Sequence, residues 1–131
     1  MERNLRESLH DCLFPVLLGS GTLCHTYVRH FWQQYRINST VLTGKRALTL
    51  RFLPNVKLVN APSGLDDEIL LCILYDAGEV GYGRIPLLVL CDEAYRGFVE
   101  RNRTEIERHF VFREAKKLLS GESEGLQNES L

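Results

Sequence analysis

The segment from Phe14 to Gly21, FPVLLGSG, decides the fold class, because a short apolar run ends there in a glycine turn. An apolar run without polar alternation is typical of a strand that is buried on both faces. Apolar residues then recur at helical spacing, which predicts a helix from about Thr22 to Arg36. A buried strand, a tight turn and an amphipathic helix make up the first part of a βαβ unit.

The same alternation continues along the chain. Strands are expected at residues 39–43, 55–60 and 86–91, with 109–112 as a last edge strand, and helices are expected to begin near Asp66 or Asp67 and at Asp92. Residues 45–54 favour a short or irregular helix, although their pattern also fits a strand. The sequence therefore predicts an α/β fold, a three-layer Rossmann-like domain with a mostly parallel sheet of about four or five strands.

One domain accounts for most of the 131 residues, a length that is ordinary for a single folding unit. Residues 14–119 are expected to form this domain, and residues 1–13 an N-terminal extension. Residues 120–131 are expected to be a disordered polar tail, because they hold too few apolar side chains to order themselves.

Composition excludes several classes of function. The formal net charge of −1 and the lack of a basic block give little support to nucleic-acid binding. The charged N-terminus does not resemble a signal peptide, and no apolar run approaches the roughly 20 residues of a membrane span. The cysteines form no CxxC pair and the histidines show no metal spacing. We therefore predict a cytoplasmic protein with no membrane partner, no metal site and no catalytic residue of its own.

The glycine turn is the first candidate site. In parallel sheets, ligands bind beyond the carboxyl ends of the strands, and glycines there let the backbone approach an anion closely. The free amides at the start of the next helix favour a phosphate or a carboxylate. The predicted ligand-binding residues are Gly19, Ser20, Gly21 and Thr22. A third glycine and an acidic residue after the second strand, both expected of a dinucleotide fingerprint, are missing.

The second candidate site is the corner after the most apolar strand, where Asp92 and Glu93 follow Cys91. Two carboxylates at a helix start normally serve as the N-cap and as a partner of the helix dipole. Their position at a strand end also places them within reach of a ligand amine or ribose. If the ligand is instead a nucleotide, Lys45 and Arg46 after the second strand are the expected contacts of a 2′-phosphate.

Taken in order, these segments resemble the N-terminal domain of ATP-grasp carboxylate–amine ligases of the D-aspartate ligase type. The resemblance covers about residues 14–113 and rests on three features: VLLGSG at 16–21, PLLVLCDE at 86–93, and the helix from Phe98 to Arg103 that leads to His109 and Phe110. It implies a Rossmann-like pre-ATP-grasp domain that forms one wall of an active-site cleft. Gly19 to Gly21, together with Asp92 and Glu93, would face that cleft.

The same resemblance implies that ATP, magnesium ions and most catalytic groups belong to a partner grasp domain, which the sequence does not contain. The chain alone is therefore not expected to bind a cofactor or to catalyse ligation, and its expected ligand is a small carboxylate or an amino acid. Two alternatives stay open: a small regulatory domain that binds an NADP(H)-type nucleotide, and an interaction domain whose pocket is degenerate.

Overall fold

A computed structural model describes residues 12–44, 53–81 and 83–114 of the chain. The strands are β1 (Leu13–Leu18), β2 (Ser39–Thr43), β3 (Val56–Asn60), β4 (Ile85–Leu90) and β5 (Val111–Glu114). The helices are α2 (Thr22–Tyr35), α4 (Asp67–Glu79), α5 (Arg96–Arg101) and α6 (Arg103–His109), and a short 3-10 turn, η1 (Glu93–Tyr95), precedes α5.

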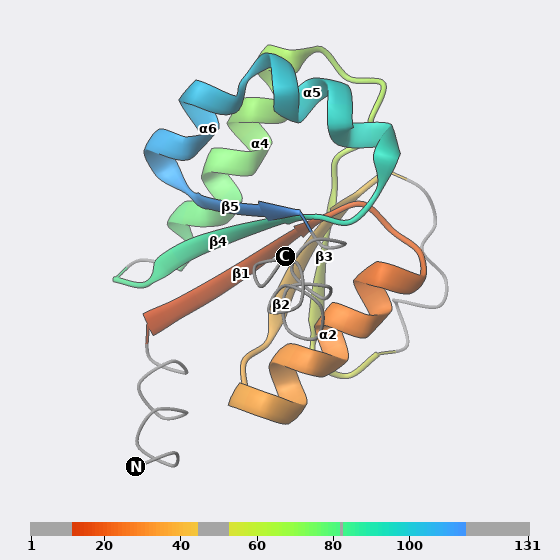
Figure 1. The fold of residues 1–131 in the computed structure, drawn as a ribbon, viewed down its shortest axis with the longest axis vertical. Coiled ribbons are helices and arrows are strands. Elements are labelled where there is room, and N and C mark those ends of the chain that lie inside the picture. The colour runs from red at the N-terminus through yellow and green to blue at the C-terminus, as the bar shows by residue number, and fades with distance from the viewer. Residues whose placement is uncertain (1–11, 45–52, 82, 115–131) are drawn as a thin grey trace, which may run out of the picture.

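The strands form one parallel sheet in the order β3-β2-β1-β4-β5. Helix α2 covers one face, and α4, α5 and α6 cover the other, so that the described residues form three layers (Figure 1). The predicted α/β, Rossmann-like fold is confirmed, and its sheet is entirely parallel. The first strand in the chain lies at the centre of the sheet because the connections run to its two sides in turn.

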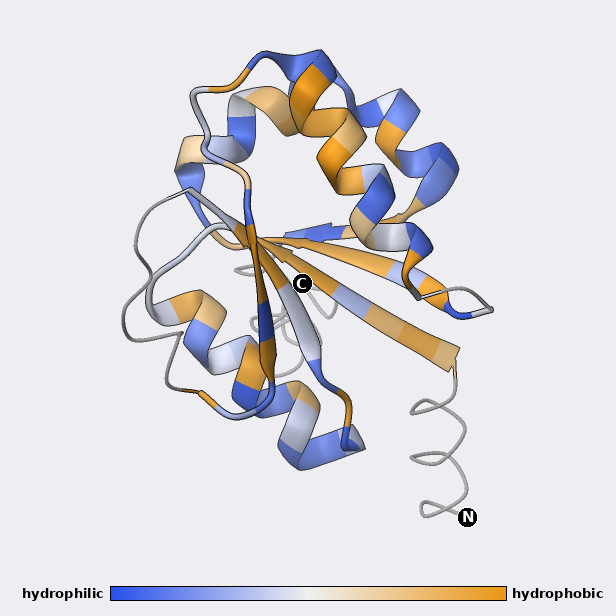
Figure 2. Cartoon of the chain, turned by 180° about the vertical axis from the view of Figure 1, so that it is seen from behind, coloured by the Kyte–Doolittle hydropathy of each residue, from blue (hydrophilic) through white to orange (hydrophobic). Residues whose placement is uncertain are grey.

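Each face of the sheet has its own hydrophobic core. Val16 and Leu18 pack against Leu74 on the α4 side, whereas Leu17 packs against Tyr27 on the α2 side, and all five side chains are almost fully buried. This alternation follows from the strand geometry, in which successive side chains point to opposite faces. Figure 2 shows that hydrophobic residues are concentrated in the central strands and in α4.

Two elements differ from the sequence prediction. The last strand begins at Val111 rather than at His109, because α6 continues to His109 and the ring of that residue packs 4.4 Å from the ring of Tyr75. The helix expected after Asp92 is divided into η1, α5 and α6. The division falls at Asn102, whose side-chain amide donates to the Phe98 carbonyl and to the Asp67 carboxylate.

Several expectations concern residues outside the described ranges. They are the element at 45–54 over most of its length, the helical turn at 115–119, the N-terminal extension up to residue 11 and the polar tail at 120–131.

Candidate ligand-binding site

The sheet changes its direction of winding between β1 and β4. From β1 the chain passes through α2 to β2 on one side, and from β3 it returns through α4 to β4 on the other side. The loops after β1 and β4 therefore diverge from neighbouring strand ends, and this divergence opens a crevice at the carboxyl edge of the sheet. Three backbone hydrogen bonds align the strand ends there: Cys91 N to Leu18 O (3.0 Å), Gly19 N to Leu42 O (2.9 Å) and Ala61 N to Thr43 O (3.0 Å).

Gly19 is the point at which the two loops touch. Its φ is +129°, a backbone conformation that L-residues rarely adopt. A Cβ at this position would lie 3.0 Å from the Asp92 amide nitrogen and closer still to the Asp92 Cβ. Glycine is therefore required both for its backbone conformation and for the space that Asp92 occupies. The two sites that the sequence predicted separately are thus in contact.

A pocket of about 310 Å³ lies at this edge of the sheet. Its polar lining comes from four strand ends, namely Ser20 after β1, Thr43 at the end of β2, Ser63 after β3, and Asp92 and Tyr95 after β4. Gly44, Pro62, Gly64 and Ala94 complete the described lining. Hydroxyl groups and one carboxylate can hydrogen-bond a small polar ligand through several directions at once.

The two adjacent carboxylates of the second candidate site point in different directions. Asp92 lines the pocket, and its Oδ1 accepts a hydrogen bond from the Ala94 amide at 3.0 Å, so it caps η1 as expected. Glu93 is not among the lining residues. Its carboxylate pairs with the Arg96 guanidinium (2.7 Å), which also reaches Glu114 at the end of β5 (3.1 Å). Only Asp92 is therefore in a position to meet a ligand in the pocket.

Tyr95 supports the floor of this pocket. Its buried hydroxyl donates a 2.7 Å hydrogen bond to the carbonyl of Ala61, the residue that follows β3. Burial raises the pKa of the Tyr95 hydroxyl above its usual value, although its contacts with the Gly44 backbone and the Thr43 side chain act in the opposite direction. The hydroxyl therefore remains protonated at neutral pH and joins the loop after β4 to the ends of β2 and β3.

The other predicted ligand-binding residues lie beside the pocket or outside the described residues. Gly21 is exposed, has a φ of +100° and precedes α2, which begins without a side-chain cap. Thr22 lies on the outer flank of α2 and does not line the crevice pocket. Lys45 and Arg46 directly follow Gly44, which does line the pocket, but both are outside the described residues.

Two buried cysteines lie beneath the crevice. Cys24 in the first turn of α2 and Cys91 after β4 form no disulfide, and their thiols contact one another. The contact with Cys24, and secondarily burial, raises the pKa of the Cys91 thiol far above its ordinary value. A thiol in this environment is a poor nucleophile, so the pair is best described as core packing.

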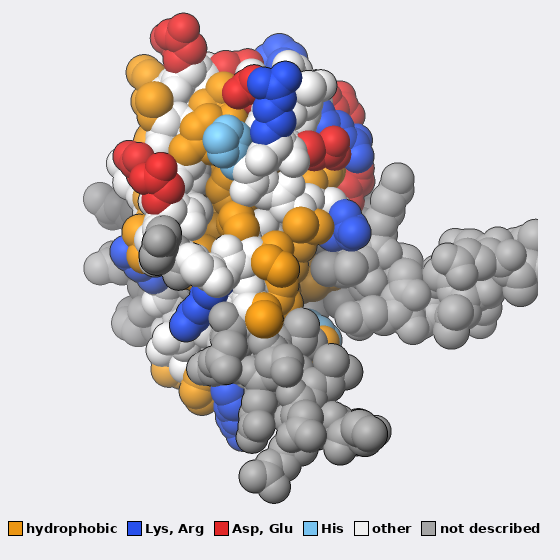
Figure 3. Space-filling view, turned by 90° about the vertical axis from the view of Figure 1, so that its left-hand side faces the viewer, with side chains coloured by type: hydrophobic (Ala, Val, Ile, Leu, Met, Phe, Trp, Pro, Cys, Tyr) orange, Lys and Arg blue, Asp and Glu red, His pale blue; other side chains and the backbone are white. Residues whose placement is uncertain are grey.

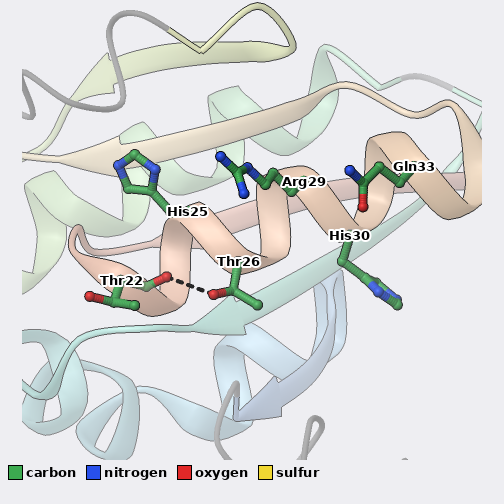
Figure 4. Close-up of a pocket in the computed structure, with 6 residues that line it drawn as sticks. All are labelled: Thr22, His25, Thr26, Arg29, His30 and Gln33. Carbon is green, nitrogen blue, oxygen red and sulfur yellow. Dashed lines mark hydrogen bonds between the residues drawn. The ribbon is translucent and has the colours of Figure 1, made fainter.

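Two further hollows are weaker candidates. One, along α2, is lined by Thr22, His25, Thr26, Arg29, His30 and Gln33, and Figure 4 shows that all six extend from this one helix, with His25 and His30 on different sides. The other is a cavity of about 180 Å³ between Tyr75, Pro86 and His109. It lies at the amino ends of the strands, where Figure 3 shows exposed hydrophobic side chains. In neither hollow do the described residues bring polar groups together from several strand ends.

The lining residues that sequence reasoning missed include Thr43, Pro62, Ser63 and Tyr95. The first three follow from a signal that was available, because they lie at or just beyond the predicted ends of the second and third strands. Tyr95 could not be separated from the core, since its helical spacing matches that of Phe98 and Val99. Among the described residues no group of three or more His, Cys, Asp or Glu side chains is arranged to hold a metal ion.

In comparisons with known proteins, no family model, curated protein or solved structure matches this chain. None of the helices in the described part of the chain is long and apolar enough to cross a membrane.

Proposed function

We propose that this chain is a ligand-binding wall of an ATP-dependent carboxylate–amine ligase of the ATP-grasp type, and that it holds a small carboxylate or amino-acid substrate. The observation that carries the proposal is the shared pocket, in which Ser20 from the glycine turn and Asp92 from the other corner line the same cavity. These two corners belong to two of the three features on which the resemblance to the pre-ATP-grasp domain rests.

The size and chemistry of the pocket support a small polar ligand. A cavity of about 310 Å³ is at the lower end of the range for small-molecule sites. Its polar groups come from backbone turns that are fixed to the sheet, so a ligand would be oriented with little rearrangement of the protein. In this proposal the chain binds and positions the substrate and does not catalyse ligation alone.

ATP and magnesium belong, in this proposal, to a partner grasp domain or subunit. Such a partner would supply the phosphoryl group that activates the carboxylate, while the residues of this chain hold the substrate against it. The proposal also places the protein in the cytoplasm, and the free state of Cys12, Cys24, Cys72 and Cys91 is compatible with a reducing compartment.

Thermal-shift titration with amino acids, small carboxylates, ATP and NADPH tests this function. A ligand that binds the folded state stabilises it by about 2.7 kcal/mol at a hundredfold excess over its dissociation constant. We expect stabilisation by an amino acid or a small carboxylate, and the stabilisation by an amino acid should be lost in Asp92→Ala. If NADPH stabilises the protein and none of the other ligands does, the result contradicts the ligase proposal.

A second function has one observation in its favour. The pocket extends to Thr43 and Gly44 at the end of β2, where dinucleotide-binding folds contact the ribose and the 2′-phosphate of the cofactor. A regulatory domain that binds NADP(H) would then use Lys45 and Arg46, the next residues of the chain. It predicts stabilisation by NADPH that is lost in Lys45→Ala and Arg46→Ala. A folded protein that responds to no ligand would instead favour an interaction domain with a degenerate pocket.

A further inference from the structure

In the described lining of the crevice pocket, a single residue carries the charge. Among the nine described residues that line it, Asp92 carries the only formal charge, and the remaining polar side chains are the hydroxyls of Ser20, Thr43, Ser63 and Tyr95. A second anion placed against this carboxylate would be repelled, and no described lining residue offers a cation to compensate. The described lining therefore favours a cationic group at the Asp92 end of the ligand.

The neighbouring acid does not change this balance. Glu93 is directed toward Arg96, with Nε to Oε1 at 2.7 Å and Nη2 to Oε2 at 3.0 Å, so its charge is compensated outside the pocket. The described lining thus presents a single carboxylate, which suits a monovalent cation better than a divalent metal ion, since Ca²⁺ and Mg²⁺ require several oxygen ligands.

Asp92 is also held in a fixed orientation. The Ala94 amide donates to its Oδ1 at 3.0 Å, and its Cβ lies where a side chain at position 19 would otherwise be. A carboxylate that is already oriented loses little conformational freedom when it accepts a further hydrogen bond. An ammonium group has three donors, and the nearby serine and threonine hydroxyls can accept those that Asp92 does not.

The geometry points to a primary ammonium group as the feature that this pocket recognises, so that the wall holds the amine-bearing substrate rather than a carboxylate without an amine. This inference rests on the proposed function and names the substrate class of the same site. A charge-assisted hydrogen bond between the ammonium and Asp92 would set the specificity. Asp92 would thus be a specificity-determining residue, and the site would discriminate by the presence of the amine.

Calorimetric titration of the full chain tests the inference. The probes are the standard amino acids in both enantiomers, followed, for any that binds, by its N-acetyl derivative and by the corresponding acid without the amino group. We expect both analogues to bind at least about tenfold more weakly, the loss of one good hydrogen bond to a charged group. Asp92→Asn keeps the oxygen that caps η1, and it should weaken the binding of the amino acid by a similar factor. Glu93→Gln is the matched control, for which we expect less than about a twofold change because Glu93 does not line the pocket.

The possible results separate the inference from the proposed function. If an acid without an amino group binds as tightly as its amino acid, or if Asp92→Asn binds like the parent, the inference fails while the ligase wall stands. If neither amino acids nor small carboxylates bind to the folded chain, the proposed function fails, and the inference falls with it. Circular dichroism of each variant ensures that a loss of binding is not a loss of fold.

Discussion

The two loops that border the crevice, after β1 and after β4, are held in their conformations in different ways. The loop after β1 has two glycines with positive φ, and α2 begins there without a side-chain cap. The loop after β4 is fixed by side chains: Asp92 caps η1, Glu93 pairs with Arg96, and Tyr95 bonds to the Ala61 carbonyl. The first loop requires residues without a side chain, whereas the second is held in place by side-chain hydrogen bonds and an ion pair. The two should therefore respond to substitution in different ways.

The largest expected effect is at Gly19. In Gly19→Ala the new Cβ meets Asp92 in a backbone conformation that alanine rarely adopts, and we expect a loss of about 3 kcal/mol in the free energy of unfolding. Urea denaturation measures it. Gly64→Ala is the matched control, because Gly64 has no positive φ and a Cβ there meets no atom within 4 Å. Equal losses in the two variants would contradict the assigned contact between the loops.

A smaller loss is expected at Gly21, which separates backbone strain from packing. Its φ is +100°, but a Cβ there would meet nothing within 4 Å. Gly21→Ala should therefore lose only the conformational term, about 1–2 kcal/mol. If it proves as damaging as Gly19→Ala in the same denaturation experiment, then strain alone governs this loop and the Asp92 contact contributes little.

The side-chain loop is tested by removing a single oxygen atom. Tyr95→Phe keeps the buried ring but deprives the Ala61 carbonyl of its 2.7 Å hydrogen bond, which should cost about 1 kcal/mol. Tyr75→Phe is the matched control, because the buried Tyr75 hydroxyl has no hydrogen-bond partner among the described residues. Removing it should be neutral or stabilising. A greater loss from Tyr75→Phe than from Tyr95→Phe would reverse the assignment of the supporting residue.

The same contrast explains which parts of the structure could be predicted from the sequence. Local signals predicted the fold, because apolar strands that end in glycine and alternate with amphipathic helices are compatible with few arrangements. The positions of Gly19 and Asp92 at one edge followed from the rule on strand ends. Their direct contact did not, since it depends on which strands are neighbours in the sheet.

Side-chain partners distant in sequence were beyond prediction. Tyr95 and Ala61 are 34 residues apart, and so are Arg101 and Asp67. The spacing of Tyr95 shows only that it faces inward, not that its hydroxyl reaches the end of β3. Likewise, the alternating charges near Arg101 fit a solvated helix face, and only the fold brings Asp67 to that face. Turn chemistry is local and can be predicted, whereas the partners of a polar side chain depend on the tertiary structure.

The smallest expected effect on stability concerns the contact between Asp67 and Arg101, which holds the start of α4 through charged side chains. Hydrogen bonds from Arg101, at 2.9 and 3.0 Å, and from Asn102 hold the pKa of Asp67 at about 2, below its ordinary value of 3.8. Because the carboxylate is favoured in the folded state, its contribution to stability is complete above about pH 4 and is lost as the pH falls toward 2.

Asp67→Asn should therefore be less stable than the parent at neutral pH, and the difference should shrink over that acidic interval. Urea titrations at successive pH values measure it, with Glu68→Gln, which removes the adjacent exposed acid, as the control. A difference that stays constant from neutral pH down to pH 2 would show that the amide substitution disturbs α4 by some means other than the loss of the ionised carboxylate. In that case the start of α4 would depend on shape, as the glycine loop does, rather than on a charged side-chain contact.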